Sequence, residues 1–171
     1  MIKVVAKINI KKAVYLTLPQ IERGLQVSSA RNVLLDNIHE GSECSCCGQF
    51  SKVYARKLNS NMAAFLISLY KEHKRTRDWV HYSDCFHKGR DYPYVALWGL
   101  ATTKSNDEDS SKRTSGFWKT TKKGRLFVTR HLNVPSHAFV YNNTVVGWSA
   151  ADVHIINALG KRFHYQELMN S

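Results

Sequence analysis

The stretch GFWKTTKKGRLFV, residues 116–128, sets the plan of the chain. Its first half, GFWKTT, is rich in aromatic and β-branched residues, which are typical of a short strand. Two lysines and Gly124 follow, and the segment then continues into the apolar residues 126–128. The pattern predicts a strand that ends near Thr121, where a basic segment leads into an apolar one.

The residues before this stretch predict three further elements and a loop. NSNMAAFLISLYKEHK, residues 59–74, places apolar side chains at three- and four-residue steps after Asn59 or Ser60, which predicts a capped helix. TRDWVHYS, residues 76–83, predicts a short strand. DYPYVALWGL, residues 91–100, has a helix-like apolar set that stops at Gly99, and SNDEDSSKRTSG, residues 105–116, is polar enough to be a solvated loop.

This order of elements resembles a winged helix-turn-helix, in which the loop between two antiparallel strands is the wing. In many winged-helix regulators the second wing strand ends in Thr, two polar residues and Gly, and a helix begins there. Thr121 to Gly124 match that pattern. The resemblance implies an α+β fold with a winged helix-turn-helix-like core.

The two ends of the chain predict additional structure. VVAKINI, residues 4–10, alternates like a strand, and SSARNVLLDNIHEG, residues 28–41, predicts a helix capped by Ser28 or Ser29 and closed by Gly41. SHAFVYNNTVVGWS, residues 136–149, predicts a β-hairpin turning at its two asparagines, and a final helix follows within residues 154–170. We therefore predict an N-terminal region over 1–43, a central domain over 44–131 and a C-terminal hairpin and helix over 132–171, packed on the same core.

The cysteines form a cluster with one distant partner. Cys44 and Cys47 make a C-x-x-C-G knuckle, a spacing that lets two thiolates face one tetrahedral zinc ion. A structural zinc site needs four ligands, and Cys85 with His87, or with His81, could complete it. We predict structural zinc on Cys44, Cys47, Cys85 and His87. Alternatively, Cys46 is the third ligand, or it is a buried apolar thiol. The alternative is that the cysteines are small core residues, and a redox pair is weakly supported because thioredoxin-type motifs open a helix after a strand.

The positive charge of the chain is concentrated in its middle. The formal net charge is +12, and residues 101–131 carry eight Lys and Arg against three Asp and Glu, whereas residues 132–171 carry two of each. A basic block of this kind favours binding of a polyanion, because each phosphate contact releases counterions. Its alternative is a well-solvated surface.

Two classes of function fit these patterns. As a DNA-binding regulator of transcription, the chain would place Arg90 and Tyr92 near the major groove and its other cations along the wing and its strand. Those other predicted contacts are Lys112, Arg113, Lys119, Lys122, Lys123 and Arg125. The alternative is a protein that binds a host enzyme or defence complex through exposed aromatic residues. The aromatic anchors to test are Trp98, Phe117, Trp118 and Trp148.

Catalysis has little support. The P-loop, zinc-protease and serine-hydrolase motifs do not occur in the sequence, so we expect no enzyme. A metal-dependent nuclease using Asp84, His87 and Asp91 is a minor alternative, because the histidine and asparagine pattern of the zinc-stapled HNH nucleases is not recognisable.

The combination of CxxCG, KVYARKLNSNMAAFLISLYK, WGL, GFWKTTKKGRLFV, VPSHAFVYNN and FHYQELM over residues 40–171 resembles a group of uncharacterised tailed-bacteriophage proteins. The resemblance implies a phage origin, a zinc-plus-winged-helix plan and action in the cytoplasm of an infected bacterium. The expected partners are DNA or a host bacterial protein, with a second copy of the chain as a further candidate. The sequence has no signal-peptide pattern and no long apolar run, so we expect a soluble protein without a membrane partner.

Overall fold

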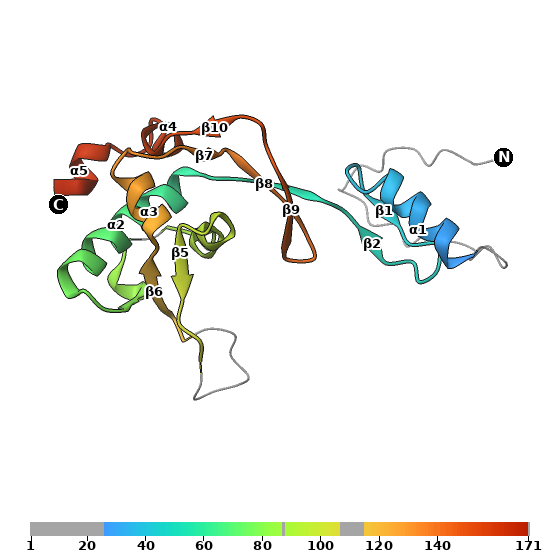
Figure 1. Cartoon of the computed structure of the whole chain (residues 1–171), viewed down its shortest axis with the longest axis horizontal. Helices are drawn as coiled ribbons and strands as arrows, with labels where there is room; N and C mark the ends of the chain where they lie inside the picture. Colours follow the sequence, from blue (N-terminus) through green and yellow to red (C-terminus); the bar gives the residue numbers. More distant parts are fainter. Residues whose placement is uncertain (1–25, 87, 107–114, 171) are drawn as a thin grey trace. The chain divides into compact units, whose positions relative to one another are not determined.

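The chain is mixed α/β with small antiparallel sheets, as the computed structural model shows (Figure 1). The structure describes residues 26–86, 88–106 and 115–170. The chain divides into two compact units, Met1–Lys52 and Val53–Ser171. The predicted strand over residues 4–10 lies outside the described residues, as does the middle of the predicted polar loop.

In the first unit, the described residues 26–52 form one helix and one hairpin. Helix α1 spans Val27–Asp36, and strands β1, Ser42–Glu43, and β2, Phe50–Ser51, pair antiparallel around the cysteine cluster. The predicted serine cap is wrong, because the helix begins one residue before Ser28 and Gln26 precedes it without a side-chain cap hydrogen bond. Gly41 adopts φ +97°, as a terminator would, but the helix has already ended at Asp36.

The second unit is built around helix α2, Ser60–Thr76, which begins as predicted. The Asn59 side chain accepts a hydrogen bond from the Met62 backbone N–H at 3.1 Å. Every side chain from position 62 to 67 is buried, so this part of the helix is covered on all sides. Two strands and four helices of this unit pack directly against α2. They are β4, Val80–His81; β6, Phe117–Thr120; η2, Tyr92–Trp98; α3, Lys122–Val128; α4, Ile155–Leu159; and α5, Tyr165–Asn170.

A three-stranded antiparallel sheet lies beside α2 in the order β4-β6-β5, where β5 spans Ala101–Thr103 (Figure 1). The 3-10 helix η1, Tyr82–Asp84, follows β4 along the chain. Trp118 on the central strand is buried and meets the ring of Phe65 on α2 edge-on, with centroids 5.8 Å apart. The sheet therefore contributes one face to the core around α2.

The predicted helix near residues 94–98 is a 3-10 helix, η2, and not an α-helix. It has Pro93 in its first turn and ends at Gly99, whose φ of +66° is the expected left-handed terminator. Val95 and Trp98 point into the core, and the Trp98 indole N–H donates to the Pro135 carbonyl at 2.6 Å. A seven-residue 3-10 helix can place these two side chains three residues apart on one side.

The C-terminal hairpin forms as predicted. Strands β8, His137–Tyr141, and β9, Thr144–Trp148, join through Asn142 and Asn143, whose φ values are +46° and +60°. Strand β3, Tyr54–Lys57, completes this sheet on the other side of β8, and β7, Val134–Pro135, pairs with β10, Asp152–Val153. The final helix packs on α2, because Lys71 donates to the Leu168 carbonyl at 3.1 Å.

Among the helices described, none combines the length and the apolar character needed to cross a membrane.

Candidate nucleic-acid interface

The last two turns of α2 present one row of side chains toward β6 and α3. His73, Lys74 and Arg77 lie three, four and seven residues after Tyr70, which places all four on one face of the helix. Arg77 ends the helix in the left-handed conformation, φ +58°, and its N–H bonds to the His73 carbonyl at 2.9 Å. Cations in this last turn interact favourably with the negative end of the helix dipole.

The opposite side is formed by the junction between β6 and α3. The Thr121 hydroxyl accepts a hydrogen bond from the Gly124 N–H at 3.0 Å and donates to the Gly99 carbonyl at 2.6 Å. This cap starts α3 and ties it to the end of η2. Gly124 is needed for packing, because a Cβ there would collide with the carbonyl of Leu100. The predicted Thr-x-x-Gly pattern therefore has a local structural reason.

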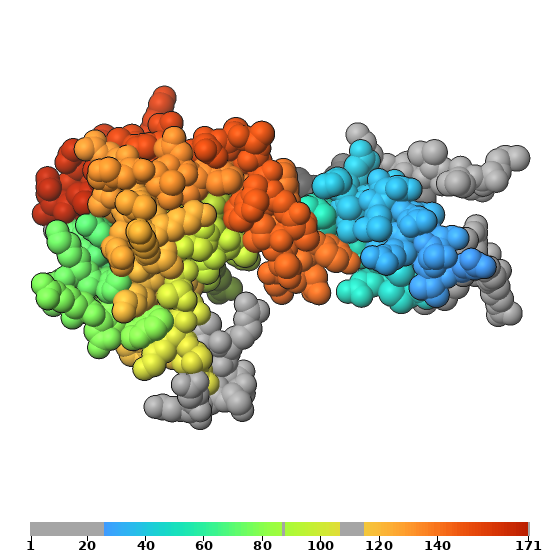
Figure 2. Space-filling view, viewed as in Figure 1, coloured from blue at the N-terminus to red at the C-terminus, as the bar shows by residue number. Residues whose placement is uncertain are grey.

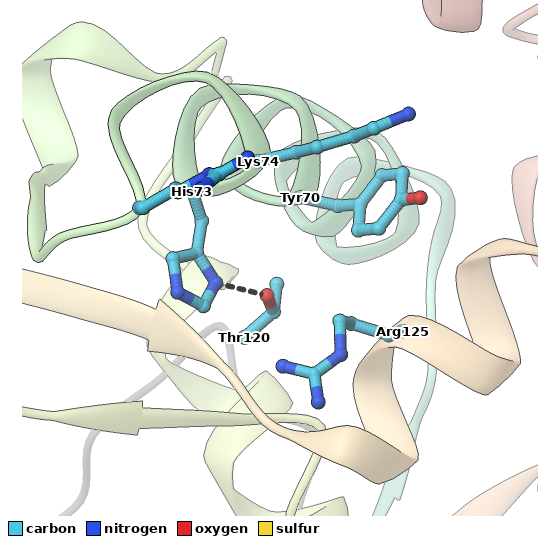
Figure 3. A pocket seen from close by; sticks show the side chains of 6 residues that line it. Tyr70, His73, Lys74, Thr120 and Arg125 are labelled. Carbon is cyan, nitrogen blue, oxygen red and sulfur yellow. Dashed lines mark hydrogen bonds between the residues drawn. The ribbon is translucent and has the colours of Figure 1, made fainter.

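These two sides enclose a pocket of about 310 Å³, drawn in Figure 3. Four of its lining residues come from α2 and its C-terminal cap, and the other two are Thr120 at the end of β6 and Arg125 on α3. In Figure 3 the Arg125 guanidinium points toward Thr120, while Tyr70 and Lys74 extend from the helix. Figure 2 shows α2, in green, and the orange atoms of the α3 region side by side on one face.

His73 and Thr120 are the most deeply buried residues of the pocket, at 8% and 2% exposed. The His73 Nδ1 lies 2.6 Å from the Thr120 Oγ1. Burial lowers the pKa of His73 below its usual value, and the positive charges of Lys119 and Arg125 lower it further, while Asp78 acts in the opposite direction. Burial and the neighbouring positive charges therefore both favour the neutral form of His73.

The pocket carries three cations on its walls and no carboxylate. Within the described part of the chain, the side chains of Lys74, Arg77 and Arg125 form no ion pair with Asp or Glu. The nearby carboxylate of Asp78 accepts a hydrogen bond from the Trp79 N–H at 2.7 Å. Three cations that line one pocket without a protein counterion make a site suited to a phosphate or another anion.

Five of the predicted nucleic-acid contacts are cations whose side chains are exposed or half-buried. Lys122, Lys123 and Arg125 are exposed on α3, and Lys119 is half-buried on β6 with its ammonium 5.8 Å from the centre of the Trp79 ring. Arg90 is exposed just before η2. The structure brings the first four to the same region of the molecule as the pocket.

Tyr92, the other residue predicted near the groove, packs its ring in an aromatic cluster. Its centroid lies 4.8 Å from that of Phe65 and 5.6 Å from that of Tyr82, on which it stacks. Burial raises the pKa of Tyr92, and the neighbouring Tyr82 raises it further. Its ring therefore supports the core beneath η2. Lys112 and Arg113 lie outside the described residues.

Sequence reasoning missed the contribution of α2. Tyr70, His73, Lys74 and Arg77 lie at the end of a helix for which the sequence predicts no site residue. Their spacing is a signal that could have found them, because polar residues at these steps share one helix face. Their convergence with Thr120 and Arg125 depends on the tertiary fold, which spacing does not give.

The predicted zinc ligands belong to different parts of the chain. Cys44 and Cys47 lie in the β1–β2 hairpin of the first unit, where the backbone N–H groups of Cys46 and then Cys47 bond to the Cys44 sulfur and lower its pKa. Cys85 is buried in the core of the second unit, and His87 lies outside the described residues. Within the described ranges, no three His, Cys, Asp or Glu side chains form a group that could hold a metal ion. Zinc therefore stays a prediction.

The aromatic residues named as anchors for a host protein divide into two pairs. Trp98 and Trp118 are buried in the core, so they are not available to a partner. Phe117 and Trp148 are 39% and 42% exposed. Two exposed aromatic rings on different sheets are ordinary for a protein surface.

The resemblance to phage proteins stays a prediction, and the proposed function rests on the geometry of the site. No protein-family model, no curated protein and no solved structure matches this chain.

Proposed function

We propose that this chain binds nucleic acid, DNA in the first place, through contacts to phosphate groups. The binding surface is a basic face made of exposed or half-exposed cations at the end of α2, on β6 and on α3. Its members are Lys74, Arg77, Lys119, Lys122, Lys123 and Arg125. The observation that carries the proposal is the pocket that Lys74, Arg77 and Arg125 line, with no carboxylate among its lining residues.

The order of elements supports this proposal. Helix α2, strand β4, the two 3-10 helices and strands β5 and β6 follow one another as the elements of a winged helix do, and the sheet order β4-β6-β5 fits that topology. In this interpretation the connection between β5 and β6 is the wing, and the basic residues of α3 stand directly after its second strand.

The properties of η2 favour binding without strong sequence preference. Reading of base edges requires Arg, Asn, Gln or similar side chains on the element that enters the groove. On η2, Val95 and Trp98 are buried, and the exposed positions Pro93 and Ala96 offer no side-chain hydrogen-bond donor. Phosphate contacts position a protein on nucleic acid but carry no sequence information.

A salt titration of binding tests the proposal. The affinity of the full chain for a short fluorescent DNA duplex is measured by anisotropy between about 50 and 200 mM salt. We expect a steep loss of affinity with salt. The double variant Lys122→Ala/Lys123→Ala should weaken binding and reduce the slope of log K against log salt by up to about two, because about one counterion is released for each phosphate contact.

A control variant with the same change in charge distinguishes the effect of the basic face on binding from the effect of the net charge of the chain. Lys161 and Arg162 are exposed on the connection between α4 and α5 and do not line the pocket. Lys161→Ala/Arg162→Ala removes two charges as well and should keep most of the affinity and slope. Absence of binding at low salt, or equal losses in both double variants, would contradict the proposal.

A further inference from the structure

The pocket between α2, β6 and α3 differs from the rest of the basic face because it is recessed. Its volume of about 310 Å³ is at the lower end of the range of small-molecule sites. A recess of this size has room for a phosphate with part of an attached sugar. The phosphates of a continuous duplex lie on a convex surface, so a recess favours a group at the end of a strand or on a small molecule.

The charge of the pocket favours a phosphate with two negative charges. A phosphodiester inside a strand carries one negative charge, whereas a phosphomonoester carries about 1.5 to 2 at pH 7 and has three acceptor oxygens. Lys74, Arg77 and Arg125 supply three positive charges with no carboxylate among the lining residues. Two of them are guanidinium groups, which can each donate two parallel hydrogen bonds to one phosphate.

The buried part of the pocket joins the elements that carry its cations. The 2.6 Å contact between His73 and Thr120 joins α2 to the end of β6, and both residues are buried. Arg125 follows only five residues after Thr120, on a helix capped by Thr121. The backbone positions that carry the cations of α2 and α3 are therefore joined through a buried polar contact, and Tyr70 lies on the same wall as Lys74.

We propose that this pocket binds a phosphomonoester, which is the terminal 5′-phosphate of a nucleic-acid strand or the phosphate of a free nucleotide. The inference rests on the proposed nucleic-acid binding, because it assigns a particular phosphate to part of the same basic face. It predicts that the chain recognises the end of a strand in addition to its backbone.

The test compares two single strands of one sequence, with a 5′-phosphate or a 5′-hydroxyl, by anisotropy with the full chain. We expect the phosphorylated strand to bind roughly tenfold more tightly, since one charge-assisted hydrogen-bond set is gained. Arg77→Gln and Arg125→Gln should each bring this ratio close to one. The matched variant Lys122→Ala/Lys123→Ala should weaken both strands and keep the ratio.

The outcomes separate the inference from the proposed function. Equal, salt-sensitive binding of the two strands overturns the phosphomonoester site and leaves nucleic-acid binding intact, whereas no binding of either strand at low salt contradicts both. Competition with adenosine 5′-monophosphate, with adenosine as control, distinguishes the two sources. If the nucleotide displaces the strand at concentrations similar to those at which the strand binds, the pocket is a nucleotide site. If displacement needs far higher nucleotide concentrations, the pocket is a site for the end of a strand.

A spectroscopic measurement keeps the test valid if an arginine variant fails to fold. The ring protons of His73 are followed by NMR while inorganic phosphate or adenosine 5′-monophosphate is added to the wild-type chain. An anion bound beside Lys74, Arg77 and Arg125 should shift the His73 signals. Its negative charge should also raise the pKa of His73, in the same direction as Asp78 and opposite to Lys119 and Arg125. Unchanged His73 signals at saturating phosphate would place the anion elsewhere and overturn the inference.

Discussion

The Nδ1 of His73 lies 2.6 Å from the Oγ1 of Thr120, and this contact joins the last turns of α2 to the last residue of β6. Both side chains are buried, so water does not replace the hydrogen bond if it is broken. The same pair forms the base of the cationic pocket. Stability and the proposed anion binding therefore depend on the same position of the fold.

Acidification should destabilise the protein through His73. Its pKa in the folded state is lowered by burial and by the charges of Lys119 and Arg125, whereas in the unfolded state it has the usual value of 6.5. Below about pH 6.5 the unfolded state binds a proton that the folded state does not, so the free energy of unfolding falls as the pH falls toward the lower, folded value. Urea unfolding between about pH 7.5 and about pH 5, a range set around the usual histidine pKa, measures the slope of the free energy of unfolding against pH.

Two variants test the assignment of this slope to His73. His73→Gln keeps a hydrogen-bonding side chain but cannot titrate, so the slope should become smaller. Lys119→Ala removes one of the charges that lower the pKa of His73 and should reduce the slope in part. An unchanged slope in His73→Gln would show that other groups cause the pH dependence.

Gly124→Ala should destabilise the protein by about 3 kcal/mol, the upper part of the range for overpacking a tight site. An added Cβ would collide with the Leu100 carbonyl, and backbone atoms cannot rotate away as a side chain can. The control Lys123→Ala, exposed on the same helix, should change stability by less than about 0.5 kcal/mol. Equal unfolding free energies for the two variants would mean that α3 shifts to make room.

Local signals in the sequence were sufficient for the elements with strong patterns. Asn59 caps α2, Thr121 caps α3, Gly99 ends η2, and Asn142 with Asn143 turns the hairpin, each as the side-chain chemistry predicts. The start of α1 was misjudged, because Gln26 occupies the cap position without a side-chain bond and two serines nearby gave a stronger local signal. The type of η2 was also misjudged, because a 3-10 turn and an α-helical turn both place residues 95 and 98 on one side.

The candidate site was only half visible in the sequence. The lysines after β6 stand out as a charge cluster, and they lie on the basic face. The α2 half is hidden in the sequence, because the apolar residues of this helix dominate its pattern and its polar residues stand out only in the last two turns. Joining Arg77 and Arg125 in one pocket needs the packing of α2 against α3, which is a long-range contact.

Trp98→Phe should lower the free energy of unfolding by about 2 kcal/mol, from the loss of one buried hydrogen bond and a small cavity. The Trp98 indole N–H donates to the Pro135 carbonyl at 2.6 Å, and this hydrogen bond joins η2 to β7. Trp148→Phe is a matched control, because its ring lies 5.9 Å from that of Trp98 but is partly exposed. We expect a loss below about 1 kcal/mol for this control in chemical unfolding, and equal losses would contradict the role of the hydrogen bond.

Cys85 should react with a thiol reagent far more slowly than the three cysteines of the first unit. It is 5% exposed, and burial, followed by the charges of Glu72 and Asp84, raises its pKa to about 12, so little thiolate is present at neutral pH. Cys46 and Cys47 are exposed. Maleimide labelling followed by peptide mass spectrometry measures each site, and the same reaction in guanidinium, where all four should react, is the control. Rapid labelling of Cys85 in the folded chain would contradict its burial.

The same labelling tests the predicted zinc. A metal-bound thiolate reacts slowly, so zinc on the C-x-x-C-G knuckle should protect Cys44 and Cys47, and a chelator should remove the protection. Cys85→Ala decides whether the buried thiol takes part. We expect protection to persist in this variant, because Cys85 packs among the core residues of the second unit. Loss of protection would make Cys85 a ligand, and labelling of Cys44 and Cys47 that zinc does not slow would exclude the knuckle as a zinc site.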